Sequence, residues 1–153
     1  MRTSELKTGR TFGLNCDHGE DFFQALAEFC RENHIRQGYI PMFLAAFAET
    51  EIAGTCAKVE DPEAPVRLPV YLEKVEAMGC GTFSYDPDSD EIVPHVHVTV
   101  GLKQQSALAY SSHLISAKVQ YLTEMLVVEV LAPEMRRPVM ADLWDVPLLT
   151  FES

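Results

Sequence analysis

Basic residues are scarce in this sequence. Its 153 residues include 12 lysines and arginines against 23 aspartates and glutamates, which gives a formal net charge of −11. Proteins that bind DNA or RNA draw most of their affinity from lysine and arginine side chains that neutralise phosphates. The densest basic stretch is Arg136-Arg137, which is only two residues long. The composition therefore argues against a nucleic acid as the principal partner.

Cysteine pairs of the kind that bind zinc are also missing. The cysteines are Cys16, Cys30, Cys56 and Cys80, and no two of them form a CxxC pair, which argues against a thiolate zinc finger. No apolar run approaches the length of about 18 residues that a membrane helix needs. The start, MRTSELKTGR, lacks the apolar core of a signal peptide. We therefore expect a cytoplasmic protein with reduced, buried thiols.

The patterns that are present predict an α+β fold. Residues 17–34 are expected to form the main helix, because Phe22, Leu26, Phe29 and Cys30 recur at helical spacing. A capping box of Asp17 and Glu20 would begin it. Most of the remaining chain alternates or is rich in β-prone residues, which predicts a mostly antiparallel sheet. The length suggests a single domain over residues 1–153.

One predicted strand carries two histidines. In the stretch VPHVHVTV, residues 93–100, His95 and His97 are two positions apart and therefore point to the same face of a strand. Val96, Val98 and Val100 point to the other face, as a core-facing stripe would. Neutral imidazole is the commonest metal ligand in proteins. Two imidazoles on one face are either half of a metal site or two polar side chains on the solvent-exposed side of a sheet.

A third histidine favours the metal. His113 lies in the next apolar segment, and an antiparallel neighbour would return it to the same region. Three histidines suit Zn²⁺ and leave a fourth position open. Glu124, on the long strand that follows, could be a fourth ligand, an acceptor for an imidazole N–H or a general base. His18 and His34 flank the helix and are expected to be surface or capping residues.

Several segments, in order, resemble the PPC domain, also called the DUF296 family, over roughly residues 10–132. GRTFGLNCDHGEDFFQALAEFCRENHI resembles its first strand and helix, and YLEKVEAMGCG its strand that bears a glutamate and ends in glycine. PHVHVTV resembles its His-x-His strand, SSHLI its Gly-Gly-His-Leu segment, and YLTEMLVVE its closing strand. The resemblance implies a strongly bent, mostly antiparallel sheet with one main flanking helix, and a homotrimer. In prokaryotic members it also implies a metal, usually zinc, at the positions of His95, His97 and His113.

Two departures from the family pattern matter. Ser111-Ser112 replace the family's two glycines before the third histidine, which raises the question of whether His113 can reach the site. The AT-hook of the plant members, a DNA minor-groove reader, is absent, so their DNA-binding role should not transfer.

Two functional hypotheses remain from the sequence. The first is a zinc-binding homotrimer whose three-histidine site acts on a small polar ligand. The alternative is a DNA-associated regulatory module or a protein-assembly module, without catalysis.

Overall fold

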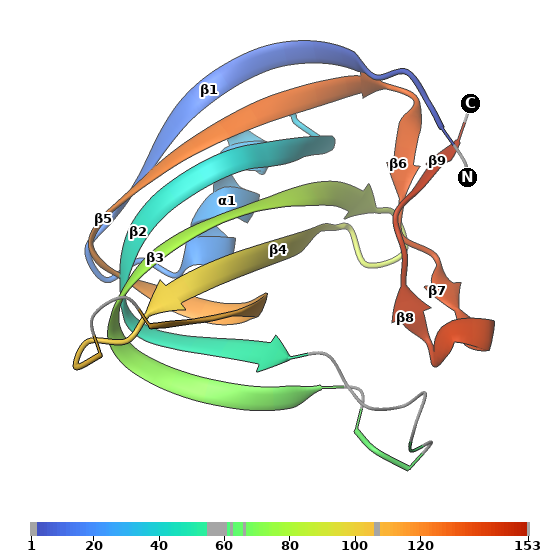
Figure 1. The fold of residues 1–153 in the computed structure, drawn as a ribbon. Helices are drawn as coiled ribbons and strands as arrows, with labels where there is room; N and C mark the ends of the chain where they lie inside the picture. Colours follow the sequence, from blue (N-terminus) through green and yellow to red (C-terminus); the bar gives the residue numbers. More distant parts are fainter. Residues whose placement is uncertain (1–2, 55–60, 62, 66, 106–107, 153) are drawn as a thin grey trace.

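A curled antiparallel sheet dominates the structure, a computed structural model that describes residues 3–54, 61, 63–65, 67–105 and 108–152 (Figure 1). The strands of the main sheet lie in the order β1-β5-β2-β3-β4, and every pairing is antiparallel. β4 also pairs with the first residues of β5, so the sheet curves round on itself. The α+β class, the bent antiparallel sheet and the main flanking helix are therefore confirmed. The elements are β1 (Lys7–Asp17), α1 (Phe22–Glu32), β2 (Gln37–Gly54), β3 (Leu68–Asp86), β4 (Glu91–Gly101), β5 (Ala109–Ala132), β6 (Glu134–Arg136), β7 (Val139–Met140), the 3₁₀ helix η1 (Ala141–Leu143), β8 (Val146–Pro147) and β9 (Thr150–Glu152).

The helix begins later than the sequence pattern predicted. The N-cap is Asp21, whose carboxylate accepts hydrogen bonds from the backbone N–H groups of the second and third residues that follow, at 3.0 and 2.9 Å. The predicted capping box exists only in part, because Glu20 accepts from the Asp17 amide at 2.6 Å before the helix starts. Asp17 itself is the last residue of β1. Asp21, directly before the apolar stripe, therefore caps the helix in place of Asp17, which lies four residues earlier.

The hydrophobic core lies between α1 and one face of the sheet. The helix contributes its predicted stripe, of which Phe22, Leu26 and Cys30 are fully buried. Phe22 packs against Phe43 and Phe47 of β2, with ring centroids 5.0 and 5.8 Å apart. The helix thus covers this face of the sheet. Functional side chains of the sheet must therefore lie on the opposite face or at its edges.

The long strands are more continuous than their sequence suggests. β2 runs unbroken through Pro41, where its register shifts between Ile40 and Phe43 in the pairing with β3 and between Tyr39 and Phe43 in the pairing with β5. Such a bulge is how a strand accommodates a residue that lacks an N–H. β3 likewise continues through Gly79 and Gly81, where the neighbouring strand passes so close that only glycine fits. β5 begins at Ala109 and is the longest strand of the sheet.

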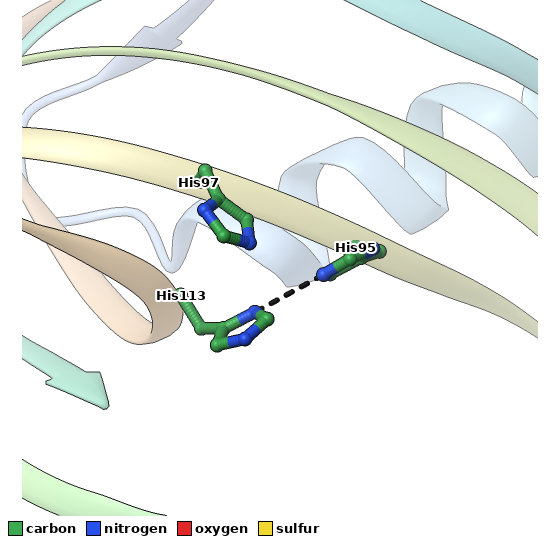
Figure 2. A group of neighbouring side chains, drawn as sticks. All are labelled: His95, His97 and His113. Atoms are coloured by element: carbon green, nitrogen blue, oxygen red, sulfur yellow. Dashed lines mark hydrogen bonds between the residues drawn. The ribbon is translucent and has the colours of Figure 1, made fainter. Parts of the chain in front are cut away.

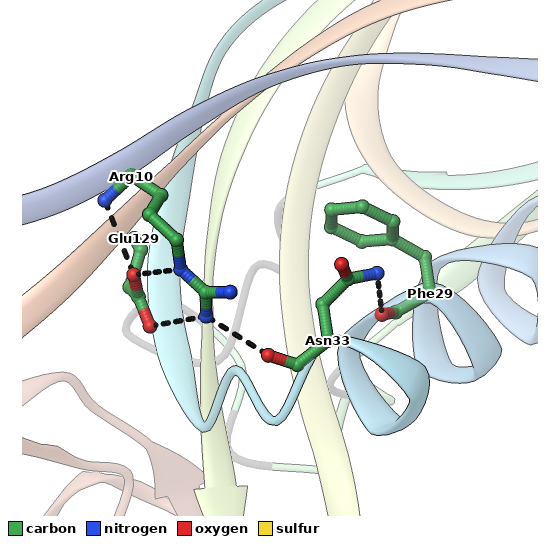
Figure 3. Close-up of polar contacts among 4 residues, drawn as sticks. All are labelled: Arg10, Phe29, Asn33 and Glu129. Carbon is green, nitrogen blue, oxygen red and sulfur yellow. Dashed lines mark hydrogen bonds and ion pairs between the residues drawn. The ribbon is translucent and has the colours of Figure 1, made fainter.

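A charged network fastens β1 to β5 and to the end of α1 (Figure 3). Arg10 Nε and Nη2 donate to the two oxygens of Glu129 at 2.8 and 2.9 Å, and the Arg10 amide adds a bond of 3.1 Å. Arg10 Nη2 also donates to the carbonyl of Asn33, the C-cap of α1, at 2.8 Å. This bidentate pair holds the edge strand and the helix end in one arrangement.

Two of the predicted buried thiols are confirmed. Cys16 and Cys30 are buried, whereas Cys80 is exposed and Cys56 lies outside the described residues. Cys80 is exposed because it sits on the face of β3 turned away from the helix, between the inward glycines at 79 and 81. Among the described residues, no helix is long and apolar enough to cross a membrane.

Candidate metal centre

The two histidines of β4 lie on the face of the sheet that the helix does not cover. Val96, Val98 and Val100 of the same strand are 1 %, 1 % and 0 % exposed and belong to the core. His95 and His97 alternate with them and point away from the core, on the exposed side of the strand. The strand-face argument from the sequence is therefore confirmed.

The closing pair of strands brings the third histidine to the same place. β4 and β5 run antiparallel, and His97 and His113 are direct partners in their register. Figure 2 shows His95 and His97 on one strand and His113 on the next, with the three rings gathered together. Ring centroids are 5.1 Å apart for His95 and His97, 5.0 Å for His95 and His113, and 4.2 Å for His97 and His113.

The serines at positions 111 and 112 do not disturb this arrangement. Neither is among the residues with positive φ, so the backbone there is ordinary strand that any residue can adopt. Ser111 Oγ accepts a hydrogen bond from Thr99 Oγ1 at 3.1 Å across the strand pair. Ser112 Oγ donates to the carbonyl of Ala53 on the other side. The serines therefore tie the start of β5 to both neighbours, and His113 stays in register.

The donor atoms have the spacing that a metal requires. One ring nitrogen from each histidine can be chosen so that all three lie within 4.8 Å of one another. His95 Nε2 and His113 Nδ1 are 3.0 Å apart. Two nitrogens that both bind a tetrahedral Zn²⁺ at about 2.0–2.1 Å would be separated by roughly 3.3 Å. Rotations about the χ angles would bring the three nitrogens to that spacing, so the residues present fit a metal ion.

The surroundings of His95 and His113 favour the neutral form of these two imidazoles. Burial, the Arg137 guanidinium and the two other histidines lower the pKa of His95 to about 4. Burial first, and then the charge of His97, lowers the pKa of His113. A neutral imidazole has a free nitrogen lone pair, which is the form that binds a metal. At neutral pH these two rings therefore do not have to lose a proton before they can ligate.

Glu124 is not part of this cluster. It lies on the exposed side of β5, in register with Asn15 of β1 and Leu44 of β2. It lies eleven positions after His113 on the same strand, and its carboxylate is not among the ligand atoms that the three histidines bring together. Its role as a base stays a prediction. His18 also lies elsewhere, where its Nδ1 accepts from the Tyr121 amide at 3.1 Å, and His34 follows the end of α1.

Sequence patterns missed two residues that border the site. Thr82 of β3 is the cross-strand partner of His95, and its hydroxyl accepts a hydrogen bond from the guanidinium of Arg137. Arg137 was visible in the sequence only as part of a short basic pair. No spacing rule could place it here, because it follows β6, which pairs with the C-terminal strand β9 and not with the main sheet.

The fold is shared with solved prokaryotic structures. The chain resembles a plant- and prokaryote-conserved (PPC) protein from Pyrococcus horikoshii, with a TM-score of 0.81 and 19% identity, covering 100% of this chain and 98% of that one. It resembles a metal-containing protein from Archaeoglobus fulgidus, with a TM-score of 0.78 and 21% identity, covering 100% of both chains. A third structure, from Bacteroides thetaiotaomicron, carries a provisional DNA-binding name; it matches with a TM-score of 0.75 and 22% identity over 97% of this chain and 99% of that one.

Curated proteins include no match to this chain. The model of the Plants and Prokaryotes Conserved (PCC) domain, however, matches residues 3–131. This range contains the His-x-His strand and the third histidine. With the match spanning most of its length, the chain belongs to the Plants and Prokaryotes Conserved domain family, as its sequence motifs predicted.

Proposed function

We propose that this protein is a zinc-binding, homotrimeric member of its family that binds a small polar ligand at the metal. The observation that carries the proposal is the convergence of His95, His97 and His113, whose ligand atoms lie within 4.8 Å of one another. Three imidazoles and no thiolate are typical of zinc sites that keep one position open, whereas structural zinc sites are closed by four protein ligands. The metal-containing relative from Archaeoglobus fulgidus agrees with a metal in this fold.

A zinc ion in such a site would supply a Lewis acid that polarises a carbonyl or lowers the pKa of a bound water. The chain's own contribution is to orient the imidazoles and to control access. His97 is exposed and faces solvent, while His95 borders an apolar depression of about 490 Å³. A ligand can therefore reach the open side of the site without any rearrangement of the sheet.

Metal analysis tests the site directly. Protein purified without a histidine tag should contain close to one zinc per chain by mass spectrometry of the metal. His95→Ala, His97→Ala and His113→Ala should each lose most of it, while His18→Gln, which alters a histidine outside the cluster, should keep it. Wild-type protein that takes up no zinc even after incubation with the ion would refute the proposal.

The trimer is proposed from an apolar patch on the same outer face. Met78 of β3 and Leu44 of β2 are cross-strand partners, 60 % and 46 % exposed. Met42, Leu122 and Leu126, on β2 and β5, are also exposed on this side. Exposed apolar side chains gathered on one face mark an interaction surface. Closed symmetric assembly of identical subunits is the commonest way to cover one, and the family resemblance is what favours three copies.

Solution mass distinguishes this arrangement from others. Light scattering should give three times the 17.1 kDa of one chain. Leu44→Lys, in the patch, should shift the protein towards the monomer, while Leu143→Lys, an exposed position on η1, should leave the mass unchanged. A wild-type monomer at micromolar concentration would contradict the trimer.

DNA association is the second candidate, because a structure of similar fold carries a DNA-binding name. The net charge of −11 opposes it. A salt-sensitive mobility shift of duplex DNA at submicromolar protein would favour DNA association over the metal-centred function.

A further inference from the structure

Arg137 is held beside the three-histidine cluster by a rigid segment. The carbonyl of Pro133 accepts from Gln37 Nε2 at 2.9 Å, and the Met135 amide donates to Gln37 Oε1 at 2.8 Å. Gln37 and Met135 are both buried. The chain therefore leaves β5 on a fixed course alongside β3 (Figure 1), and Arg137 follows two residues after the buried anchor.

The guanidinium ends next to His95. Arg137 Nη2 donates to the hydroxyl of Thr82, and Thr82 is paired with His95 across β3 and β4. Consistent with this position, Arg137 lowers the pKa of His95 more than any other charged group does, although burial lowers it most. The exposed Arg67 also lowers the pKa of both His95 and His113.

Arg137 therefore places a positive charge close to the histidine cluster, through Thr82, the cross-strand partner of His95. A divalent cation at the histidines would add two more positive charges. The guanidinium and the metal ion together would attract an anion to the space between them.

Arg137 also lacks a carboxylate partner of the kind that Arg10 and Arg136 have. Arg10 pairs with Glu129 at 2.8 Å, and Arg136 pairs with Glu134 at 2.8 Å. Across the described residues, the guanidinium of Arg137 has no ion pair and only the neutral Thr82 hydroxyl as acceptor. Its Nε is buried with no hydrogen-bond partner, and burial lowers the pKa of this arginine. A desolvated cation without a counter-ion is costly, and a bound anion would relieve that cost.

We propose that Arg137 is the anion-binding residue of the three-histidine site, and that its ligand is a small carboxylate shared between the guanidinium and a metal held by the histidines. This inference rests on the proposed metal function. A carboxylate has two oxygens, so one can bind the open metal position while the other accepts from the arginine.

The surroundings favour a small organic anion over a phosphodiester chain. The depression that reaches His95 and His97 is walled mainly by apolar side chains, including Tyr39, Ile40 and Phe151. Thr82, which accepts the hydrogen bond from Arg137, also lines this depression, whose volume is about 490 Å³. The rest of the surface is acidic and repels polyanions. We therefore expect the carboxylate to carry a short aliphatic group.

Anion titrations of cobalt-substituted protein test this assignment, because the visible absorption of Co²⁺ changes when an exogenous ligand binds. Isobutyrate is the carboxylate probe and inorganic phosphate the comparison. Wild-type protein should bind isobutyrate saturably and more tightly than phosphate. Arg137→Gln should weaken the affinity by about tenfold or more, as expected for loss of a charge-assisted hydrogen bond, while its cobalt content stays unchanged.

The adjacent arginine provides a matched control. Arg136→Gln removes a positive charge one residue away, but Arg136 pairs with Glu134, so isobutyrate affinity should stay at the wild-type value. Arg137→Lys keeps the charge without the forked donors and should give an intermediate affinity. It also serves if Arg137→Gln fails to fold.

The outcomes separate the two proposals. Wild-type protein that binds no cobalt or zinc overturns the metal function itself. Protein that binds metal but shows no response to isobutyrate, or an equal response in the Arg137 variants, overturns only the role of Arg137. Preference for phosphate, dependent on Arg137, overturns the carboxylate assignment.

Discussion

Gly79 is the position where a single methyl group should disturb both the fold and the site. It lies in β3 directly against β4, and a Cβ added there would be 2.3 Å from the carbonyl oxygen of His97 and 2.5 Å from Cζ of Phe43. Ordinary contact begins at 3.4 Å, so the neighbours would have to retreat by about 1 Å. One of them is backbone in the middle of the His-x-His strand, and the other is a fully buried ring.

The expected change in the free energy of unfolding is the difference between two opposing effects. Overpacking a filled core costs about 1–3 kcal/mol or somewhat more, and two obstructed contacts place Gly79→Ala at the upper end. Reduced freedom of the unfolded chain offsets about 0.4–1 kcal/mol. The net loss should be about 2 kcal/mol, which lowers Tm by roughly 4–8 °C for a chain of this size.

Thermal unfolding by circular dichroism, at equal protein concentrations and without metal, measures this effect. Gly101→Ala is the control: it lies on β4, and its added Cβ would meet only the Glu76 carbonyl, at an ordinary 3.6 Å. Its Tm should equal or slightly exceed the wild-type value. The zinc affinity of Gly79→Ala should fall as well, because His97 moves with its carbonyl. If Gly79→Ala melts at or above the temperature of Gly101→Ala, the close-approach argument is wrong.

Three further predictions concern the scaffold. Asp21→Ala removes the N-cap of α1 and should cost about 1 kcal/mol of unfolding free energy in urea titrations, whereas an unchanged midpoint would mean that the cap contributes nothing. The hydrogen bonds from Arg10 lower the pKa of Glu129; its stabilisation is therefore present above the unfolded value of about 4.5 and is lost as the pH falls through the lower folded pKa. Glu129→Gln should reduce Tm at pH 7, with the difference from wild type shrinking in acid; a constant difference would contradict this. Burial raises the pKa of Cys16 to about 11 and of Cys30 to about 12, so peptide mapping should find both unlabelled by a thiol reagent at pH 8 until denaturant is added.

Local patterns determined much of this protein from the sequence alone. The alternation of histidines and valines in residues 93–100 fixed which side chains face the core, because a strand has a period of two residues. The apolar stripe of 22–30 identified the helix and its buried face. The order of short motifs identified the family. Each of these inferences depends only on residues that are close in the chain.

Tertiary structure decided what depends on distant segments. That His113 faces His97 results from the register of β4 with β5, and the sequence could only suggest it. The continuity of β3 through Gly79 depends on how closely β2 and β4 approach it, which no local propensity encodes. The separation of Glu124 from the histidines arises because β5 is one long strand whose start and middle pair with different neighbours. Arg137 lies near His95 because Gln37, 96 and 98 positions earlier in the chain, hydrogen-bonds the Pro133 carbonyl and the Met135 amide just before it. The sequence thus contained the three histidines as a pattern, whereas the negative charge that we propose for their ligand was inferred from the long-range packing of Arg137.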